Sequence, residues 1–242
     1  MKNRNEFDNY DEVMPEGIKR TAMPIIFLLD VSGSMTPVKH YLNRATNVFL
    51  HNIKSNKDAS RIVEAIIVPF NHEIQGNDLD WKTVCEIPEV CLSTSGGTNL
   101  SKALQFANDK LKERCNMYED IGAELRGPTI FLVTDGYGGD ISEIAKEIRK
   151  REEDKKVLIA VYAVEGYDKK TISQLGERAM VWESSKDDFE QAIGQFIDFA
   201  SDFVKAKSVS APGERIVISE ECNPDKRKDS VLKRADLDDW MN

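Results

Sequence analysis

The stretch IIFLLDVSGS at residues 25–34 joins an apolar run to a short polar turn. Its first five residues are all apolar and show no alternation, which is typical of a strand buried on both faces. The turn then carries a carboxylate on Asp30 and hydroxyls on Ser32 and Ser34. Three oxygen atoms directed toward one place suit Mg²⁺, which prefers oxygen ligands in octahedral geometry. The stretch therefore predicts a buried strand that ends at a candidate metal site.

The rest of the chain alternates apolar runs with amphipathic segments. Further strands are predicted at 62–70, at 81–87 as a short edge strand, at 129–134, at 157–164 and around Val181 and Trp182. Helices are predicted from Thr36 and Pro37, from Leu100, from Asp140 and Glu143 as a capping box, and from Phe189 as the final helix. This alternation predicts one doubly wound, Rossmann-like α/β domain with a mostly parallel central sheet and helices on both faces.

Two further loops carry candidate oxygen ligands. Thr98 lies in the glycine-rich turn SGGTNL at 95–100, which opens a helix, and Asp135 follows the strand at 129–134. Ligands of a doubly wound sheet bind beyond the carboxyl ends of the strands, so we expect these loops to meet there around one Mg²⁺ or Mn²⁺ ion. The expected metal site consists of Asp30, Ser32, Ser34, Thr98 and Asp135. The backbone amides of Gly33 and Ser34 are expected to favour an incoming carboxylate.

From about residue 22 to residue 204 the chain resembles the von Willebrand factor A (VWA) family. The resemblance rests on the DxSxS, threonine and aspartate elements of that family's metal-ion-dependent adhesion site (MIDAS), which the five residues above match in order. It implies an N-terminal extension at 1–21, a VWA domain at 22–206 and a C-terminal extension at 207–242. It also implies a binding module that is not an enzyme, in which an Asp or Glu carboxylate of a protein partner completes the metal shell.

Three segments, MPIIFLLDVSGSM, STSGGTNLSKAL and PTIFLVTDGYGGD, resemble stand-alone bacterial VWA proteins of the tellurium-resistance, TerY-like type. This implies an adaptor or regulatory scaffold in a bacterial stress-response or phage-defence system, with a PP2C-like phosphatase and a serine/threonine kinase as partners. One alternative is a VWA partner of an AAA+ chelatase-like machine. The other is a metal-dependent phosphohydrolase, but the haloacid dehalogenase type typically has a second acidic residue where Ser32 stands. The motifs of P-loop NTPases and GxSxG hydrolases are absent.

Composition narrows the class of protein. A chain of 242 residues with 40% hydrophobic residues can bury one substantial core. A net charge of −9 argues against nucleic-acid binding, which needs a concentrated basic surface. Residues 1–20 lack the apolar run of a signal peptide, and no apolar stretch approaches the ~20 residues that span a bilayer. We therefore expect a soluble, cytoplasmic protein that binds neither nucleic acid nor membrane.

The cysteines and the C-terminal segment carry weaker signals. The cysteines form no CxxC pair, so we expect free, buried thiols rather than a zinc site or a disulfide framework. Residues 208–213 are linker-like, RIVI at 215–218 could add one strand, and the charge-rich residues 223–242 predict a disordered tail. Alternatively, LDDWM at 237–241 could dock on a partner through its tryptophan.

Overall fold

A computed structural model describes residues 20–76, 78–136, 139–176, 178–211 and 214–236 of the chain. Within these ranges one sheet has the strand order β3-β2-β1-β5-β6-β7-β8, with β4 paired to β1 beside this path. The parallel strands are β1 (Thr21–Asp30), β2 (Val63–Phe70), β5 (Thr129–Thr134), β6 (Leu158–Val164) and β7 (Met180–Ser184). Two-residue strands complete the sheet: β4 (Glu124–Leu125) runs parallel to β1, whereas the edge strands β3 (Lys82–Thr83) and β8 (Lys233–Arg234) are antiparallel. The prediction of a mostly parallel α/β sheet is confirmed.

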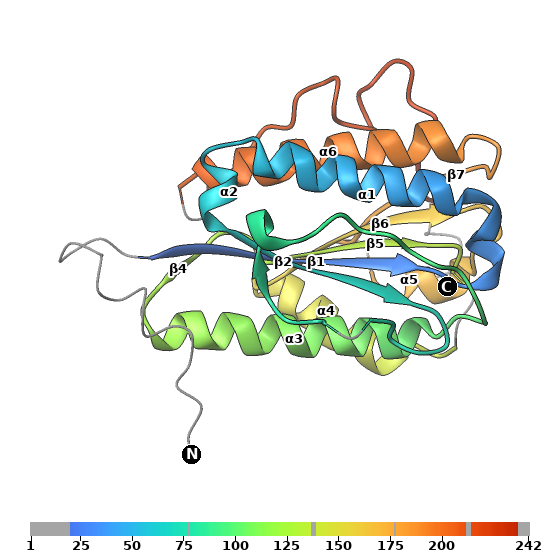
Figure 1. Ribbon diagram of the computed structural model, residues 1–242. Coiled ribbons are helices and arrows are strands. Elements are labelled where there is room, and N and C mark those ends of the chain that lie inside the picture. The colour runs from blue at the N-terminus through green and yellow to red at the C-terminus, as the bar shows by residue number, and fades with distance from the viewer. Residues whose placement is uncertain (1–19, 77, 137–138, 177, 212–213, 237–242) are drawn as a thin grey trace.

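Helices cover both faces of this sheet (Figure 1). On one face lie α1 (Lys39–Lys54), α2 (Ala59–Ile62) and α6 (Phe189–Val209). On the other lie α3 (Leu100–Asp120), α4 (Ser142–Glu153) and α5 (Lys169–Ser173). No helix in the described part of the chain has both the length and the apolar character that crossing a bilayer requires.

Strand β1 explains why the opening stretch is continuously apolar. Successive side chains of a strand point to opposite faces, so Ile25, Phe27 and Leu29 pack beneath α1 and α6, while Ile26 and Leu28 pack against α3 and α4. All of these side chains are fully buried. The ring centroid of Phe27 lies 4.7 Å from that of Phe49 on α1 and 5.0 Å from that of Phe131 on β5. A strand with helices over both faces has no position at which a polar residue would reach water.

Three local predictions differ from the structure. The helix expected from Thr36 begins earlier, as a 3₁₀ helix over Gly33–Val38 that contains Pro37, before α1 starts at Lys39. The capping box expected at Asp140 is wrong, because α4 starts at Ser142 without a side-chain cap on its N-cap residue, and Asp140 Oδ1 instead accepts a hydrogen bond from Ser142 N in a local turn. The edge strand expected at 81–87 is reduced to β3, followed by a 3₁₀ helix over Val84–Glu86.

The disordered tail predicted for residues 223–242 is wrong over its described part. The side chain of Gln195 on α6 holds this segment, because its Oε1 accepts hydrogen bonds from Val231 N at 3.0 Å and Leu232 N at 3.3 Å. Trp182 Nε1 donates to Asp225 Oδ1 at 2.7 Å, and Leu232 is only 3% exposed. No strand forms at 215–218, whereas β8 pairs with β7. The docking motif expected at 237–241 lies outside the described residues.

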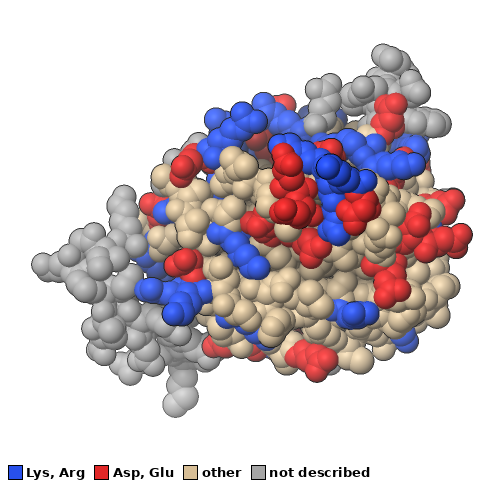
Figure 2. All heavy atoms as spheres, turned by 90° about the horizontal axis from the view of Figure 1, so that it is seen from above, with Lys and Arg blue, Asp and Glu red and all other residues tan. Residues whose placement is uncertain are grey.

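Charged side chains of both signs share the surface of the protein. Figure 2 shows the face that carries α1 and α6, where basic and acidic side chains are interspersed without a large surface of one sign.

The four cysteines are unpaired, but only Cys115 is buried, and Cys85 and Cys91 are exposed. The expectation of buried thiols is therefore wrong for those two.

Candidate functional site

The carboxyl end of β1 places a carboxylate inside the protein. Asp30 is fully buried, and its two oxygens accept hydrogen bonds from Ser32 N at 2.9 Å and from Thr134 Oγ1 at 2.7 Å. Gly136 N in turn donates to Thr134 Oγ1 at 2.9 Å. The Asp30 carboxylate is thus fixed in orientation by its own turn and by the end of the neighbouring strand β5.

The second expected carboxylate lies beside the first. Asp135 directly follows β5, which pairs with β1, and its side chain is 2% exposed. Its negative charge contributes to raising the pKa of Asp30, so the two carboxylates are close enough to repel each other. Asp135 Oδ1 is buried and has no hydrogen-bond partner among the described residues. A buried carboxylate oxygen without a donor is costly and needs a cation or a proton.

Burial also acts on Asp30 itself. Desolvation raises its pKa from 3.8 to about 6, although the hydrogen bonds from Ser32 and Thr134 oppose this rise by favouring the charged form. The arrangement therefore holds a carboxylate in a place where ionisation is unfavourable unless positive charge is supplied.

The two serines of the turn extend from this buried pair toward the surface. Ser32 is 1% exposed, whereas Ser34 is exposed. Their Oγ atoms lie 3.0 Å apart. The hydroxyls thus form a short path from the buried carboxylates to solvent, where a ligand from outside can approach.

The loop that carries Thr98 is tied to the same turn through its backbone. Gly33 N donates to Gly96 O at 2.8 Å, and Ser95 N donates to Val31 O at 2.9 Å. A Cβ on Gly33 would lie 3.3 Å from Gly96 O, so the missing side chain permits this close approach. Thr98 is half-buried in this loop. Three loops expected from the sequence therefore meet, although the expected role of Gly33 N toward a carboxylate is wrong because Gly96 O already occupies it.

Two residues that support the site were not foreseen. Thr134 orients Asp30, as described above, and Asn71 holds the loop of Thr98. Asn71 is 2% exposed, its Nδ2 donates to Ser95 O at 3.0 Å, and its backbone carbonyl accepts from Asn99 N at 2.8 Å. A polar residue at the end of a buried strand, next to Asp135 or directly after β2, is the signal that could have identified both.

The donors present are of the kind that hard divalent cations prefer. No cluster of three or more His, Cys, Asp or Glu side chains able to hold a metal is found in the described residues. The expected set instead combines two carboxylates with three hydroxyls, and all of these donors are oxygen atoms. The uncompensated Asp135 Oδ1 and the repulsion between the two carboxylates are features that a cation would relieve, so the residues fit such an ion.

Comparisons with known proteins bear on the same region. Residues 25–137 match the family model described as von Willebrand factor type A domain. This range contains the second half of β1, all of α3 and β5, and the five expected site residues. No curated protein matches the sequence.

Solved structures share the fold at low sequence identity. Three examples are the pilus adhesin SpaC of Lactobacillus rhamnosus GG in an open conformation (12% identity, TM-score 0.59), the PilB minor pilin of Streptococcus sanguinis (11%, 0.53) and proximal thread matrix protein 1 of the mussel byssus (18%, 0.53). The matches cover 78%, 84% and 76% of this chain, but only 31%, 65% and 46% of those chains. These similarities concern the fold alone.

Proposed function

We propose that this chain, whose residues 25–137 match the model of the von Willebrand factor type A domain, is a protein-interaction module that binds a partner through a divalent cation. Asp30, Ser32, Ser34, Thr98 and Asp135 would hold Mg²⁺ or Mn²⁺ at the carboxyl end of the sheet. An Asp or Glu carboxylate of the partner would complete the shell. The observation that carries the proposal is the buried Asp135 Oδ1, which lacks a hydrogen-bond donor beside a second buried carboxylate.

The electrostatics of the pair favour a cation over a proton. Protonation of Asp30 would satisfy only one of the two acids, and the pKa of about 6 leaves this carboxyl mainly ionised at neutral pH. Burying charge without compensation is unfavourable by several kcal/mol or is avoided by neutralisation. A divalent cation neutralises both carboxylates at once.

The composition of the site favours a ligand from outside the chain. Three of the five proposed ligands are uncharged hydroxyls, and Ser34 is exposed. When bound, the ion supplies a Lewis-acidic position that prefers an anionic oxygen. The chain's own residues fix Asp30 and leave the Ser34 side open, so a partner's carboxylate can reach it. This is a binding role that requires no catalytic group.

The partners we propose follow from the resemblance to TerY-like proteins. They are a PP2C-like phosphatase and a serine/threonine kinase, with this chain as an adaptor or regulatory scaffold in a bacterial stress-response or phage-defence system. An acidic loop on either protein would provide the carboxylate.

Affinity capture tests this proposal. The immobilised full chain would be incubated with cell extract in Mg²⁺ and, separately, in EDTA, and bound proteins identified by mass spectrometry. The same capture would be done with Asp30→Ala and with the control Asp140→Ala, because Asp140 is exposed and makes only a local turn contact. We expect partners that the wild type and Asp140→Ala retain in Mg²⁺, and that EDTA or Asp30→Ala removes. Equal capture by folded Asp30→Ala would contradict the proposal.

A further inference from the structure

A cavity lies at the end of the sheet opposite the proposed cation site. It is a cavity of about 900 Å³ near the amino ends of β5 and β6, lined by parts of α3, α4 and α6 and by the segment that joins β4 to β5. Asp30 lies at the carboxyl end of β1, which runs parallel to β5. The cavity is therefore separate from the proposed cation site. Its volume falls within the range of small-molecule sites, about 300 to 1,000 Å³.

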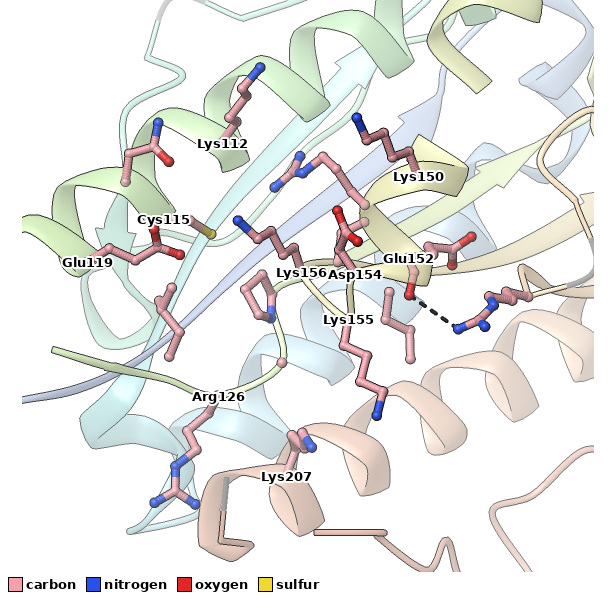
Figure 3. Close-up of a pocket in the computed structure, with 18 of the residues that line it drawn as sticks. Lys112, Cys115, Glu119, Arg126, Lys150, Glu152, Asp154, Lys155, Lys156 and Lys207 are labelled. Atoms are coloured by element: carbon pink, nitrogen blue, oxygen red, sulfur yellow. Dashed lines mark hydrogen bonds between the residues drawn. The ribbon is translucent and has the colours of Figure 1, made fainter. Parts of the chain in front are cut away.

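The lining of this cavity is rich in basic residues although the chain as a whole is acidic. Figure 3 shows Lys112 and Lys150 on one side of the cavity, Arg126 and Lys207 on the other, and Lys155 between them. In the described residues, the ammonium groups of Lys150, Lys155 and Lys207 form no ion pair or hydrogen bond. The helix C-termini at this end favour cations, which accounts in part for the lysines in the last turns of α4 and α6.

The helix dipoles do not explain why Lys155 adopts a positive φ. This residue has φ 57°, and it is the one non-glycine residue with positive φ in the described ranges. It follows the C-terminus of α4, where Lys155 N donates to Glu152 O at 3.0 Å and Lys156 N to Arg151 O at 2.8 Å. Glycine or asparagine is the usual residue at such a position. A lysine kept there despite the backbone cost points to a use for its side chain.

Two further cations are held at the cavity by the chain around them. Lys207 packs on Gly127, where an added Cβ would lie 2.9 Å from Lys207 Cε, so the glycine allows the lysine stem to lie across the β4–β5 segment. Arg126 lies beside Glu124. Its Nη1 is buried and has no hydrogen-bond partner in the part of the chain that the structure describes. Lys207 therefore retains its donors for an external anion, whereas Arg126 is ion-paired with Glu124 and its Nη1 is enclosed by the protein.

The acidic residues of the lining are largely engaged within the protein. Glu147 Oε1 lies 3.3 Å from Lys112 Nζ, and Glu214 Oε2 accepts from Ala211 N at 2.7 Å. Glu152 is 6% exposed, and burial raises its pKa to about 7. Asp154 and Glu119 are exposed. The lining thus contains eight Lys and Arg side chains against five Asp and Glu side chains, so basic groups remain in excess in the cavity.

We propose that this cavity binds a small organic phosphate of nucleotide size. Its phosphate oxygens would accept hydrogen bonds from the ammonium groups of Lys155 and Lys207, since charge-assisted bonds of this kind are the strong ones. Its organic part would lie against the apolar side chains of Leu125, Pro128 and Leu158, which line the same cavity. A site with a few convergent charges and an apolar wall is typical of small-molecule binding.

Calorimetry with ADP and with pyrophosphate tests the proposal. Titrations of the full chain would be made in EDTA, so that phosphate cannot bind through a divalent ion at Asp30. We expect ADP to bind, and to bind more tightly than pyrophosphate, because only ADP has an organic part. We expect Lys155→Gly and Lys207→Gln each to weaken ADP binding roughly tenfold. Lys155→Gly keeps the fold, since glycine suits the positive φ at this position.

The control is Lys57→Gln, because Lys57 is exposed and lies outside the cavity. It should bind ADP like the wild type, as should Asp30→Ala. Absence of ADP binding at millimolar concentration would overturn the proposal, as would equal losses in Lys57→Gln and Lys207→Gln. Equal affinity for pyrophosphate and ADP would overturn the part played by the apolar wall.

Discussion

The two ends of the sheet differ in charge and in how that charge is held. At the carboxyl end, Asp30 and Asp135 are buried and surrounded by backbone and hydroxyl groups of three loops. At the amino end, a cavity is lined by Lys155 and Lys207, which have no ion-pair partner among the described residues. Helices of such a domain begin near the first end and finish near the second, so their dipoles favour acidic groups at one and basic groups at the other. Each end also has one feature that helix dipoles do not explain: Asp135 Oδ1 is buried without a hydrogen-bond donor in the described residues, and Lys155 has a positive φ.

Each end also contains one buried carboxylate whose pKa is raised mainly by burial. Asp30 is in contact with groups that can share a cation, whereas Glu152 Oε2 has no hydrogen-bond partner in the described ranges and Oε1 accepts only from Ile159 N at 3.2 Å. We therefore expect a divalent cation to stabilise the ionised form of Asp30 and to leave Glu152 unaffected.

Glu152→Gln should have the largest effect on the pH dependence of stability. The pKa of Glu152 is about 7 in the folded chain against an ordinary value of 4.5, so folding favours the protonated form. Its contribution is present below about pH 4.5 and is lost as the pH rises through 7, a change of up to about 3 kcal/mol. Urea unfolding between about pH 5 and pH 8 should show a correspondingly smaller loss of stability in Glu152→Gln.

The neighbouring Glu153→Gln is the matched control, because Glu153 is exposed on the same helix turn. It should keep the wild-type pH profile, and Mg²⁺ should leave the difference between the two variants unchanged. If Mg²⁺ cancelled the Glu152 effect, the distinction between the two ends would be wrong.

Asn71→Ala should lower both stability and cation affinity at the carboxyl end. The variant removes a buried amide that donates to Ser95 O and whose Oδ1 accepts from Glu73 N at 2.9 Å. We expect a loss of about 2 kcal/mol in the free energy of unfolding and roughly tenfold weaker Mn²⁺ binding, as for other residues that orient metal ligands. Urea unfolding and Mn²⁺ calorimetry would measure the two effects.

Asn47→Ala separates these effects. Asn47 also holds a loop through its amide, with Nδ2 donating to Val90 O at 2.9 Å and Oδ1 accepting from Val90 N at 2.8 Å, on helix α1. It should lose comparable stability and retain Mn²⁺ affinity. Weaker Mn²⁺ binding in both variants would show a general effect of destabilisation rather than a role for Asn71 in the site.

Lys155→Gly should have the smallest effect on stability, and in the opposite direction. Glycine relieves the cost of the positive φ at the end of α4, so we expect the free energy of unfolding to rise by about 0.5 to 1 kcal/mol. Lys156→Gly in the same turn gains no such relief and should be neutral or destabilising. Equal effects of both substitutions in urea unfolding would contradict the argument that a backbone cost is accepted at Lys155.

The sequence predicts the inner strands well because their cause is local. β1 and β5 are continuous apolar runs that end in a polar turn, and such runs form strands covered on both faces. Residues at the carboxyl ends of neighbouring parallel strands must then lie close together, which is why the proximity of Asp30 and Asp135 could be expected.

Other features depend on contacts between distant residues. Thr134 matters only because its hydroxyl meets Asp30 across two strands, and Asn71 only because the loop of Thr98 crosses over it. The segment after α6 has few apolar residues, so its composition suggests disorder, yet Gln195 on α6 holds it through backbone hydrogen bonds. No periodic pattern within one segment reveals such pairings.

Binding of Mn²⁺ to Asp135→Ala tests the main claim most directly. The variant removes the buried oxygen that lacks a donor. In EDTA its free energy of unfolding should therefore fall by no more than a small internal cavity costs. Calorimetric titration should show a single Mn²⁺ ion bound by the wild type and by Asp140→Ala, and none by Asp135→Ala. Mn²⁺ binding of wild-type affinity in folded Asp135→Ala would contradict the claim that the two buried carboxylates hold the ion together.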